Sequence, residues 1–262
     1  MRAGRSVPKQ VQIWASLVLA LVVAVVGAAQ AQPVRLTYAL PAAIPAGGPV
    51  VLDLRIHNDG PADVLVDVAP RFFARISVEV VRPSGERVSL PSVAEREQGF
   101  QQTGSTVLKP GADSTRSVVL NRWVDFTEQG VYRILVRAAA GPVRTAAGEP
   151  IQVNQPAEIP VRILPRDAEA LRLICSGLFQ QSLAPSAEEV LRAAMALSYV
   201  SDPVAVPYLR RLADRPLLAP EAVEGLVRIG GSEAVAALTE LAGHRDEFIS
   251  SVAKSGLQRL RR

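Results

Sequence analysis

The sequence ALSYVSDPVAVPYLRRL occupies residues 196–212, and a related sequence, GLVRIGGSEAVAALTEL, occupies residues 225–241. The second copy begins 29 residues after the first, so that Leu197 corresponds to Leu226. In both copies the apolar residues recur with the 3.6-residue period of an amphipathic helix. A repeat of this length predicts stacked helices that bury a shared core.

The first copy resembles the short HEAT repeat, whose pattern reads roughly A-L-x-x-I-G-D-x-x-A-V-x-x-L-x-x-L. Residues 193–197, Asp202 and residues 205–209 match this pattern. The second copy departs from it at Gly231-Ser232, where the family often has Gly-Asp, and at Glu221-Ala222, where Val-Arg is common. The resemblance covers about 95 residues, as two clear repeats with a partial unit on each side. It implies a short α-solenoid that binds partners along a surface.

Local signals predict where the neighbouring helices begin. The apolar period changes to 3.6 at Pro165, and Ser186 with Glu189 three residues later forms a capping box. Asp202-Pro203 combines an N-cap with proline at the first helical position. Pro207 is therefore tolerable only within the first turn of the helix that follows.

The last helix is predicted from Asp246 to about Leu260. Acidic residues open this helix, and Arg259, Arg261 and Arg262 close it, which complements the helix dipole. A basic tail that binds anionic lipid is the alternative interpretation, but the dipole and solubility explain the same residues.

From Val34 to about Leu164 apolar and polar residues alternate instead, and turn signals recur. The clearest example is VVLDLRIH at residues 50–57, which NDGP at residues 58–61 then ends. Further alternating sets lie at residues 36–40, 64–68, 76–80, 88–90, 118–120, 132–136 and 159–163. Seven to nine short strands with one apolar face each predict an antiparallel β-sandwich.

The segment NRWVDFTEQGVY at residues 121–132 connects two of these expected strands. Asp125, Gly130 and Tyr132 match the D-x-x-x-x-G-x-Y stretch of bacterial immunoglobulin-like modules, which include some protease-inhibitor-type domains. The segment also resembles the tyrosine corner of immunoglobulin-like sandwiches, which implies that the Tyr132 hydroxyl bonds back to upstream backbone. Trp123 is expected to pack in the core or at this corner rather than to bind a ligand.

Between Leu90 and Val118 the chain becomes polar, above all in residues 95–105. We expect residues 91–114 to form either an inert loop or a loop that binds a partner. The residue types do not separate these two possibilities.

Residues 1–31 have the features of a secretory signal peptide. Three basic residues, Arg2, Arg5 and Lys9, precede an apolar run. The run extends from about residue 13 to residue 29, and an A-x-A cleavage site follows at residues 29–31. We expect cleavage after Ala31 and export to the periplasm or beyond the cell. The alternative is an uncleaved membrane anchor, because the run approaches the roughly 17 residues that can span a bilayer.

Composition excludes several classes of protein. Of the 262 residues, 48% are hydrophobic and 21% are charged, which is typical of a globular chain. Lys and Arg number 29 against 25 Asp and Glu, and removal of residues 1–31 leaves 26 against 25, a net charge of +1. Without a concentrated basic face this charge argues against nucleic-acid binding. One Cys excludes an intramolecular disulfide, and two His are too few for a His-built metal cage.

The sequence holds little that points to catalysis. It contains no P-loop, dinucleotide-binding, zinc-protease, nucleophile-elbow or C-x-x-C motif. Residues 251–254 match S-x-x-K, but the companion motifs S-D-N and K-T-G are absent. His57 closes a strand and His244 lies in a turn, so the sequence offers no reason for them to meet. Cys175 falls in an apolar helical stripe, where a free Cys behaves as a small hydrophobe.

These observations predict an all-β region followed by an all-α region. The expected parts are a signal peptide at 1–31, an immunoglobulin-like β-sandwich at 32–165 and HEAT-like helical repeats at 166–262. We assign no catalytic, cofactor-binding or metal-ligating residue and expect no cofactor.

The sequence favours an exported, non-catalytic bacterial adaptor or scaffold. It would bind a protein partner through the helical-repeat face, the 91–114 loop, or both. No nucleic acid is expected as a partner, and membrane contact is expected only if the N-terminal segment stays uncleaved. The alternatives are an envelope protease inhibitor or chaperone-like module, and an enzyme with an unrecognised site.

Overall fold

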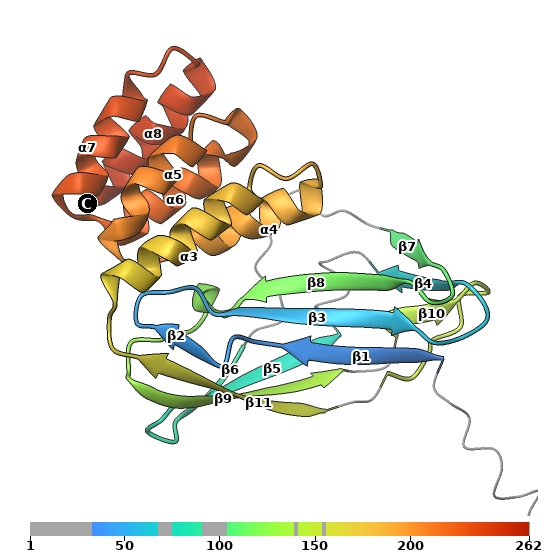
Figure 1. Cartoon of the computed structure of the whole chain (residues 1–262). Helices are drawn as coiled ribbons and strands as arrows, with labels where there is room; N and C mark the ends of the chain where they lie inside the picture. The colour runs from blue at the N-terminus through green and yellow to red at the C-terminus, as the bar shows by residue number, and fades with distance from the viewer. Residues whose placement is uncertain (1–32, 68–74, 91–103, 139–140, 154–155, 262) are drawn as a thin grey trace, which may run out of the picture.

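The computed structural model describes residues 33–67, 75–90, 104–138, 141–153 and 156–261 (Figure 1). A β-rich region of three sheets comes first in the chain, and a region of six α-helices follows it. The predicted order of an all-β part before an all-α part is therefore confirmed. The expected signal segment 1–31 lies outside the described residues, as do residues 91–103 of the expected polar loop.

The first sheet has the order β1-β3-β8, and all of its strands are antiparallel. Its strands are β1 (Val34–Ala39), β3 (Val51–Asn58) and β8 (Asp113–Val119). A second, short sheet contains β10 (Val143–Thr145), β4 (Val64–Asp67) and β7 (Ser105–Leu108). The third contains β2 (Ala43–Pro45), β11 (Ala157–Leu164), β9 (Gly130–Ala138), β5 (Ile76–Val81) and β6 (Arg87–Ser89). In this third sheet β2 pairs with β11 in parallel and the other pairings are antiparallel.

The β1-β3-β8 sheet lies over the third sheet (Figure 1). The alternating residues of their strands form one hydrophobic core. Leu52, Leu54 and Ile56 of β3 are fully buried, and they share this core with Tyr132 and Ile134 of β9. The intervening residues of β3 face the other side, where the sheet carries polar and charged groups. The period of two therefore reports directly which face of the strand is buried.

Asn58 ends β3 and connects it to the short sheet. Its side chain is fully buried, and the Nδ2 group donates to the carbonyl oxygens of Ala62 at 2.9 Å and of Leu108 at 3.0 Å. The Oδ1 atom accepts from the backbone N–H of Gly60 at 3.0 Å. One amide side chain thus bonds three backbone groups, of which the Leu108 carbonyl oxygen is buried.

The expectation that residues 91–114 form a single loop is wrong for its described end. Residues 105–108 form β7, which pairs with β4, and β8 already begins at Asp113. Three of the four β7 residues are exposed, because this strand lies at the edge of its sheet. An exposed edge strand has no buried face and therefore no alternation of apolar and polar residues. For this reason the sequence pattern did not predict β7.

Tyr132 makes the backbone contact that the sequence predicts for it. Its ring is fully buried against Phe126, with the ring centroids 4.9 Å apart, and its hydroxyl accepts from the N–H of Glu128 at 3.2 Å. Trp123 packs partly buried against the same core, with the Arg122 guanidinium 5.1 Å from its ring centroid. Trp123 is therefore a packing residue.

The helical region contains three successive helix pairs. The helices are α3 (Ala168–Gln181), α4 (Ala187–Ser198), α5 (Val206–Leu212), α6 (Ala219–Ile229), α7 (Gly231–Ala242) and α8 (Glu247–Leu260). Short 3-10 turns precede α5 and α6, namely η3 (Pro203–Ala205) and η4 (Pro216–Leu218), and a third such turn, η2 (Leu120–Arg122), follows β8.

Two helices begin where the capping signals predict, whereas Asp202-Pro203 begins the 3-10 turn η3 and α5 begins only at Val206. Ser186 accepts the N–H of Glu189 at 3.4 Å, and Asp246 accepts the N–H groups of Phe248 and Ile249. Pro207 lies in the first turn of α5, where a missing N–H costs no helical hydrogen bond. Each of these caps joins residues two or three positions apart, so the sequence alone predicts it.

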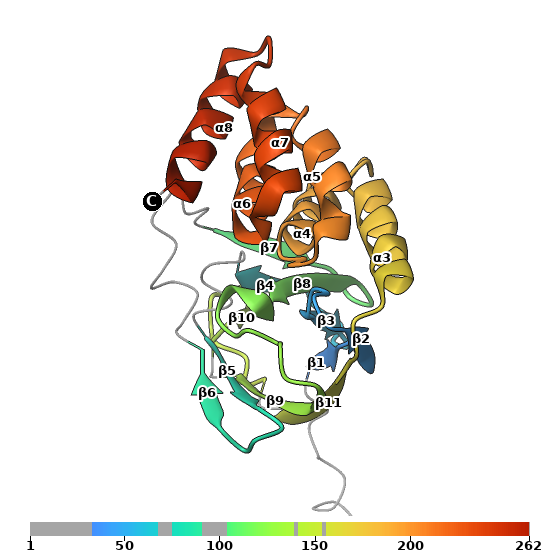
Figure 2. The same ribbon diagram turned by 90° about the vertical axis from the view of Figure 1, so that its left-hand side faces the viewer.

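The helix pairs stack in two layers (Figure 2). Helix α6 packs on α4 and on α8, whereas α5 packs on α3 and on α7. The two aligned copies, 196–212 and 225–241, each run from the end of one pair into the start of the next. The 29-residue offset of the sequence repeat therefore corresponds to the spacing from one helix pair to the next along the chain.

Gly225 allows α6 to approach α4 and α5 closely. A Cβ atom at this position would lie 2.9 Å from Ser198 Cα and 3.0 Å from the Leu209 side chain. We expect Gly225→Val to lower the free energy of unfolding by about 2 kcal/mol, because overpacking forces backbone shifts. Urea unfolding followed by circular dichroism at 222 nm measures this loss. Gly177→Ala is the matched control, since a Cβ there meets open space, and an equal loss in both variants would contradict the account.

Candidate functional site

A charged contact joins the β-rich region to the helices where the chain crosses from β11 to α3. Arg166 donates from Nε to Oδ2 of Asp202 and from Nη2 to Oδ1 of Asp202, and the Nη2–Oδ1 distance is 3.1 Å. Asp202 is 5% exposed and also accepts the N–H of Val204, so it caps η3. A second link is made by backbone alone, from the N–H of Ser201 to the carbonyl oxygen of Gly47 at 3.0 Å. The two regions are thus fastened at the turn between the first two helix pairs.

A second set of contacts joins α4 to β8. Arg116 is 8% exposed, and its Nη1 donates to Glu188 at 3.1 Å and to the carbonyl oxygen of Thr115 at 3.1 Å. Arg192 approaches Asp53 to 3.5 Å. These ion pairs and the Asp202 contact hold the helical region at two separate points.

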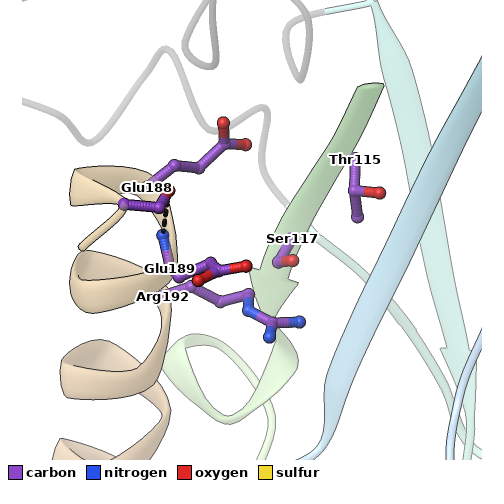
Figure 3. Close-up of a pocket in the computed structure, with 6 residues that line it drawn as sticks. Thr115, Ser117, Glu188, Glu189 and Arg192 are labelled. Atoms are coloured by element: carbon purple, nitrogen blue, oxygen red, sulfur yellow. Dashed lines mark hydrogen bonds between the residues drawn. The ribbon is translucent and has the colours of Figure 1, made fainter. Parts of the chain in front are cut away.

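A polar cleft of about 270 Å³ lies between α4 and β8, beside these contacts (Figure 3). Its lining residues are Thr115, Ser117, Ser186, Glu188, Glu189 and Arg192. Glu189 and Arg192 extend from α4 toward Ser117, whereas the Glu188 carboxylate points away from them (Figure 3). This cleft is the first candidate binding site.

The turns within the three helix pairs line up along one margin of the helical region. Arg215 of the α5–α6 turn donates to the carbonyl oxygen of Ser182 in the α3–α4 turn. His244 of the α7–α8 turn lies 3.7 Å from Asp214 of the α5–α6 turn. These contacts place the three turns, at residues 182–186, 213–218 and 243–248, side by side.

Two of the turns each expose one large apolar side chain, and the first turn of α8, directly after the third turn, exposes another. Leu183 is 54% exposed, Leu217 is 91% exposed and Phe248 is 52% exposed. We name the row formed by Leu183, Leu217 and Phe248 the turn ridge. It is the second candidate binding site.

Charged residues lie in the α5–α6 turn and on the helices that adjoin it. Arg210 bridges Asp214 at 2.7 Å and Glu240 at 2.6 Å, and the Arg211 guanidinium lies 4.4 Å from the ring centroid of Phe179. Apolar side chains inside a rim of Arg and acidic residues are typical of protein-binding surfaces.

The two histidines lie in different regions of the protein. His57 Nδ1 lies 2.9 Å from Asp113, which also takes two bonds from Arg55. The hydrogen bonds from Arg55 and His57 lower the pKa of Asp113 to about 2. This exposed cluster forms an ion-pair network on the outer face of the β1-β3-β8 sheet and contains no Ser.

His244 lies near Ser250, Ser251 and Lys254 in an open hollow of about 610 Å³ on α8. His244 Nδ1 accepts the N–H of Asp246 at 3.0 Å, so the neutral ring carries its proton on Nε2 and has no free lone pair for a serine hydroxyl. Ser250 donates to the carbonyl oxygen of Ala242 instead. His244 is therefore not placed to act as the base for Ser250.

Cys175 is fully buried in the core of the helical region. Burial raises the pKa of its thiol to about 12, so the nucleophilic thiolate is scarce at neutral pH. We expect no alkylation by iodoacetamide at pH 8 within an hour in the folded protein and complete alkylation in urea. Mass spectrometry of the intact chain measures both, and rapid labelling of the folded protein would contradict the assignment of Cys175 as a packing residue.

In the described parts of the chain no group of three His, Cys, Asp or Glu side chains is placed to hold a metal ion. No helix within those parts is both long and apolar enough to cross a bilayer.

The sequence reasoning did not find the cleft or the turn ridge. Both depend on contacts between residues that are far apart in the chain, such as Arg116 with Glu188. One signal for the turn ridge was present, because Leu183 and Leu217 are large apolar residues that fall outside the helical period. The proposed partner-binding loop contributes Thr115 next to its end, but residues 91–103 lie outside the described structure.

No protein-family model and no curated protein sequence matches the chain. A β-glucosidase from Listeria innocua in complex with glucose is similar over 50% of this chain and 16% of its own, with 16% identity and a TM-score of 0.27. The CARDB domain of a Pyrococcus furiosus protein, in complex with di-metal ions, is similar over 50% of this chain and 87% of its own, with 13% identity and a TM-score of 0.26. The alkylpurine DNA glycosylase AlkC of Pseudomonas fluorescens, bound to DNA containing an abasic site analog, is similar over 53% of this chain and 33% of its own, with 19% identity and a TM-score of 0.24. Similarities this weak assign neither a family nor a function.

Proposed function

We propose that this protein is an exported, non-catalytic adaptor of the bacterial envelope, which binds a protein partner through the turn ridge. In this proposal the β-rich region is an immunoglobulin-like sandwich and the helical region is a short HEAT-like array. The signal-peptide features of residues 1–31 support export, and the repeat at 196–241 supports the helical array.

The observation that carries the proposal is the exposure of Leu183, Leu217 and Phe248 on three adjacent turns. A single exposed leucine needs no explanation, but a row of large apolar side chains within a charged rim favours a binding surface. Leu217 is the most exposed of the three, so it is the expected anchor for a pocket on the partner.

The junction between the two regions supports a role in presenting this surface. Asp202 and Glu188 both pair with arginines across the junction, so the helices are held at two points. A rigid mount reduces the entropy that binding would otherwise cost. The β-rich region would then fix the direction in which the turn ridge points.

Substitution of the turn ridge tests the proposal. We expect the double variant Leu217→Asp and Phe248→Asp to reduce recovery of the partner at least tenfold, because a charge cannot enter an apolar pocket without a large desolvation cost. The measurement is affinity purification of the tagged protein from the envelope fraction, with quantitative mass spectrometry.

The matched control is Val131→Asp, which changes an exposed apolar residue of β9 that is 42% exposed. We expect this control to recover the same proteins as the unchanged chain. Since all three residues are exposed, each variant should unfold within about 0.5 kcal/mol of the unchanged chain. Equal recovery by the ridge variant and the control would reject the turn ridge as the binding surface.

A further inference from the structure

The outer edge of β8 is free of strand partners among the described residues, since β8 pairs there only with β3. Two backbone bonds fix which groups face that edge. The N–H of Asn58 donates to Ala112 and the N–H of Leu120 donates to Val50. In the antiparallel register, the even-numbered residues of β8 therefore bond to β3. The N–H and C=O groups of Thr115 and Ser117 point away from β3.

The Arg116 side chain occupies part of this edge. Its side chain lies on the buried side of the strand but turns at the edge to bond the Thr115 carbonyl oxygen and Glu188. An inward-pointing charge on an edge strand is a known protection against pairing with other chains. Arg116 bonds the Thr115 carbonyl oxygen, whereas the backbone N–H and C=O groups of Ser117 have no hydrogen-bond partner among the described residues.

The polar cleft lies directly beside these uncovered groups. Ser117 lines it from the strand, and Glu189 lines it from α4 (Figure 3). Of the charged residues at the cleft, Glu188 is paired with Arg116 and Arg192 approaches Asp53. The Glu189 side chain makes no hydrogen bond or ion pair with any described residue. Among the described residues, the cleft therefore holds one carboxylate without a direct ion-pair partner, together with Arg192, next to two backbone groups without a strand partner.

We propose that this cleft binds an extended segment of a partner protein that carries a Lys or Arg side chain. The segment adds to β8 as a short strand, and its backbone bonds the N–H and C=O of Ser117. Its cationic side chain pairs with Glu189. Strand addition supplies affinity through the main chain, while a side-chain pocket supplies selectivity.

This site is separate from the turn ridge and makes different demands on its ligand. The turn ridge offers apolar side chains, whereas the cleft offers hydroxyl groups, a carboxylate and a strand edge. An extended segment fits the cleft better than a helix does, because a helix has already used its backbone groups internally. The binding site at β8 would therefore stand even if the turn ridge had no function.

A displayed library of random linear nonapeptides tests the proposal. Selection is made on the full chain carrying Leu217→Asp and Phe248→Asp, so that the turn ridge cannot capture peptides. We expect the enriched peptides to share a Lys or Arg flanked by β-branched residues. In the complex, hydrogen exchange at the Thr115 and Ser117 amides should slow at least tenfold.

Three variants locate the binding. Ser117→Pro removes the N–H at the free edge and leaves the backbone bonds between β8 and β3, although it also removes the bond at 2.5 Å from Ser117 Oγ to Asp53 of β3. We expect it to weaken binding of the selected peptides at least tenfold. Glu189→Gln should weaken binding about fivefold while leaving the fold unchanged, so it remains informative if Ser117→Pro fails to fold. Ser117→Thr keeps the backbone groups and should bind as the unchanged chain does. Enrichment of peptides without a cation, or full binding by Glu189→Gln, would overturn the proposal.

Discussion

Replacement of Asn58 with Asp is expected to lower the free energy of unfolding by about 4 kcal/mol at pH 7. The carboxylate would lose the two bonds that Nδ2 donates to Ala62 and Leu108 and would face their carbonyl oxygens instead. The side chain is fully buried, so water cannot replace these bonds. A buried unpaired acceptor costs about 1–3 kcal/mol, and a buried charge costs more.

The measurement is urea unfolding followed by the fluorescence of Trp123, which packs on the core that contains this site. The loss should shrink at pH 4, because a protonated acid can donate one of the two bonds. The burial of Asp at this site raises its pKa in the folded state, so the variant gains relative stability as the pH falls. A loss below about 1 kcal/mol, or a loss independent of pH, would contradict the role assigned to Asn58.

Replacement of Asp202 with Ala is expected to cost about 3 kcal/mol in the unfolding of the helical region. It removes the cap on the N–H of Val204, which contributes about 1–2 kcal/mol. It also removes both bonds from Arg166, and solvent limits their contribution because the Arg166 side chain is 58% exposed. Asp202→Asn keeps a capping oxygen and should lose about half as much.

The contribution of Asp202 depends on pH in a defined direction. Burial opposes its ionisation, but the bonds from Arg166 and the Val204 N–H outweigh burial and hold its pKa below the ordinary value. Its stabilising effect is therefore complete above the unfolded-state pKa of about 4 and is lost as the pH falls through the folded-state pKa. Thermal unfolding at pH 7 and pH 3, followed at 222 nm, should give a smaller difference between Asp202→Ala and the unchanged chain at pH 3. A difference that grows at pH 3 would contradict this account.

The features that the sequence predicted correctly are local ones. Ser186 and Asp246 cap helices through backbone groups two or three residues away, so the short pattern contains the whole interaction. The buried face of β3 follows from alternation alone. Tyr132 reaches Glu128 only four residues upstream.

The features that it missed depend on contacts across long stretches of chain. Arg116 meets Glu188 only after α4 has packed beside β8, and Arg166 meets Asp202 only after the first helix pair has brought Asp202 back to the start of α3. Strand β7 was missed for a different reason, because an exposed edge strand carries no apolar pattern. The turn ridge was missed because a single exposed apolar residue is common, and the sequence does not show that the three turns are neighbours in space.

The central claim is that the turn ridge contacts another protein in the cell envelope. The most direct measurement places a photoreactive amino acid at position 217 in the full-length chain and irradiates intact cells. The account predicts one dominant crosslinked protein at position 217 that is lost when Phe248→Asp is added and is absent when the photoreactive group is placed at position 131. Crosslinking of the same proteins from both positions, or no crosslinked protein from position 217, would contradict it.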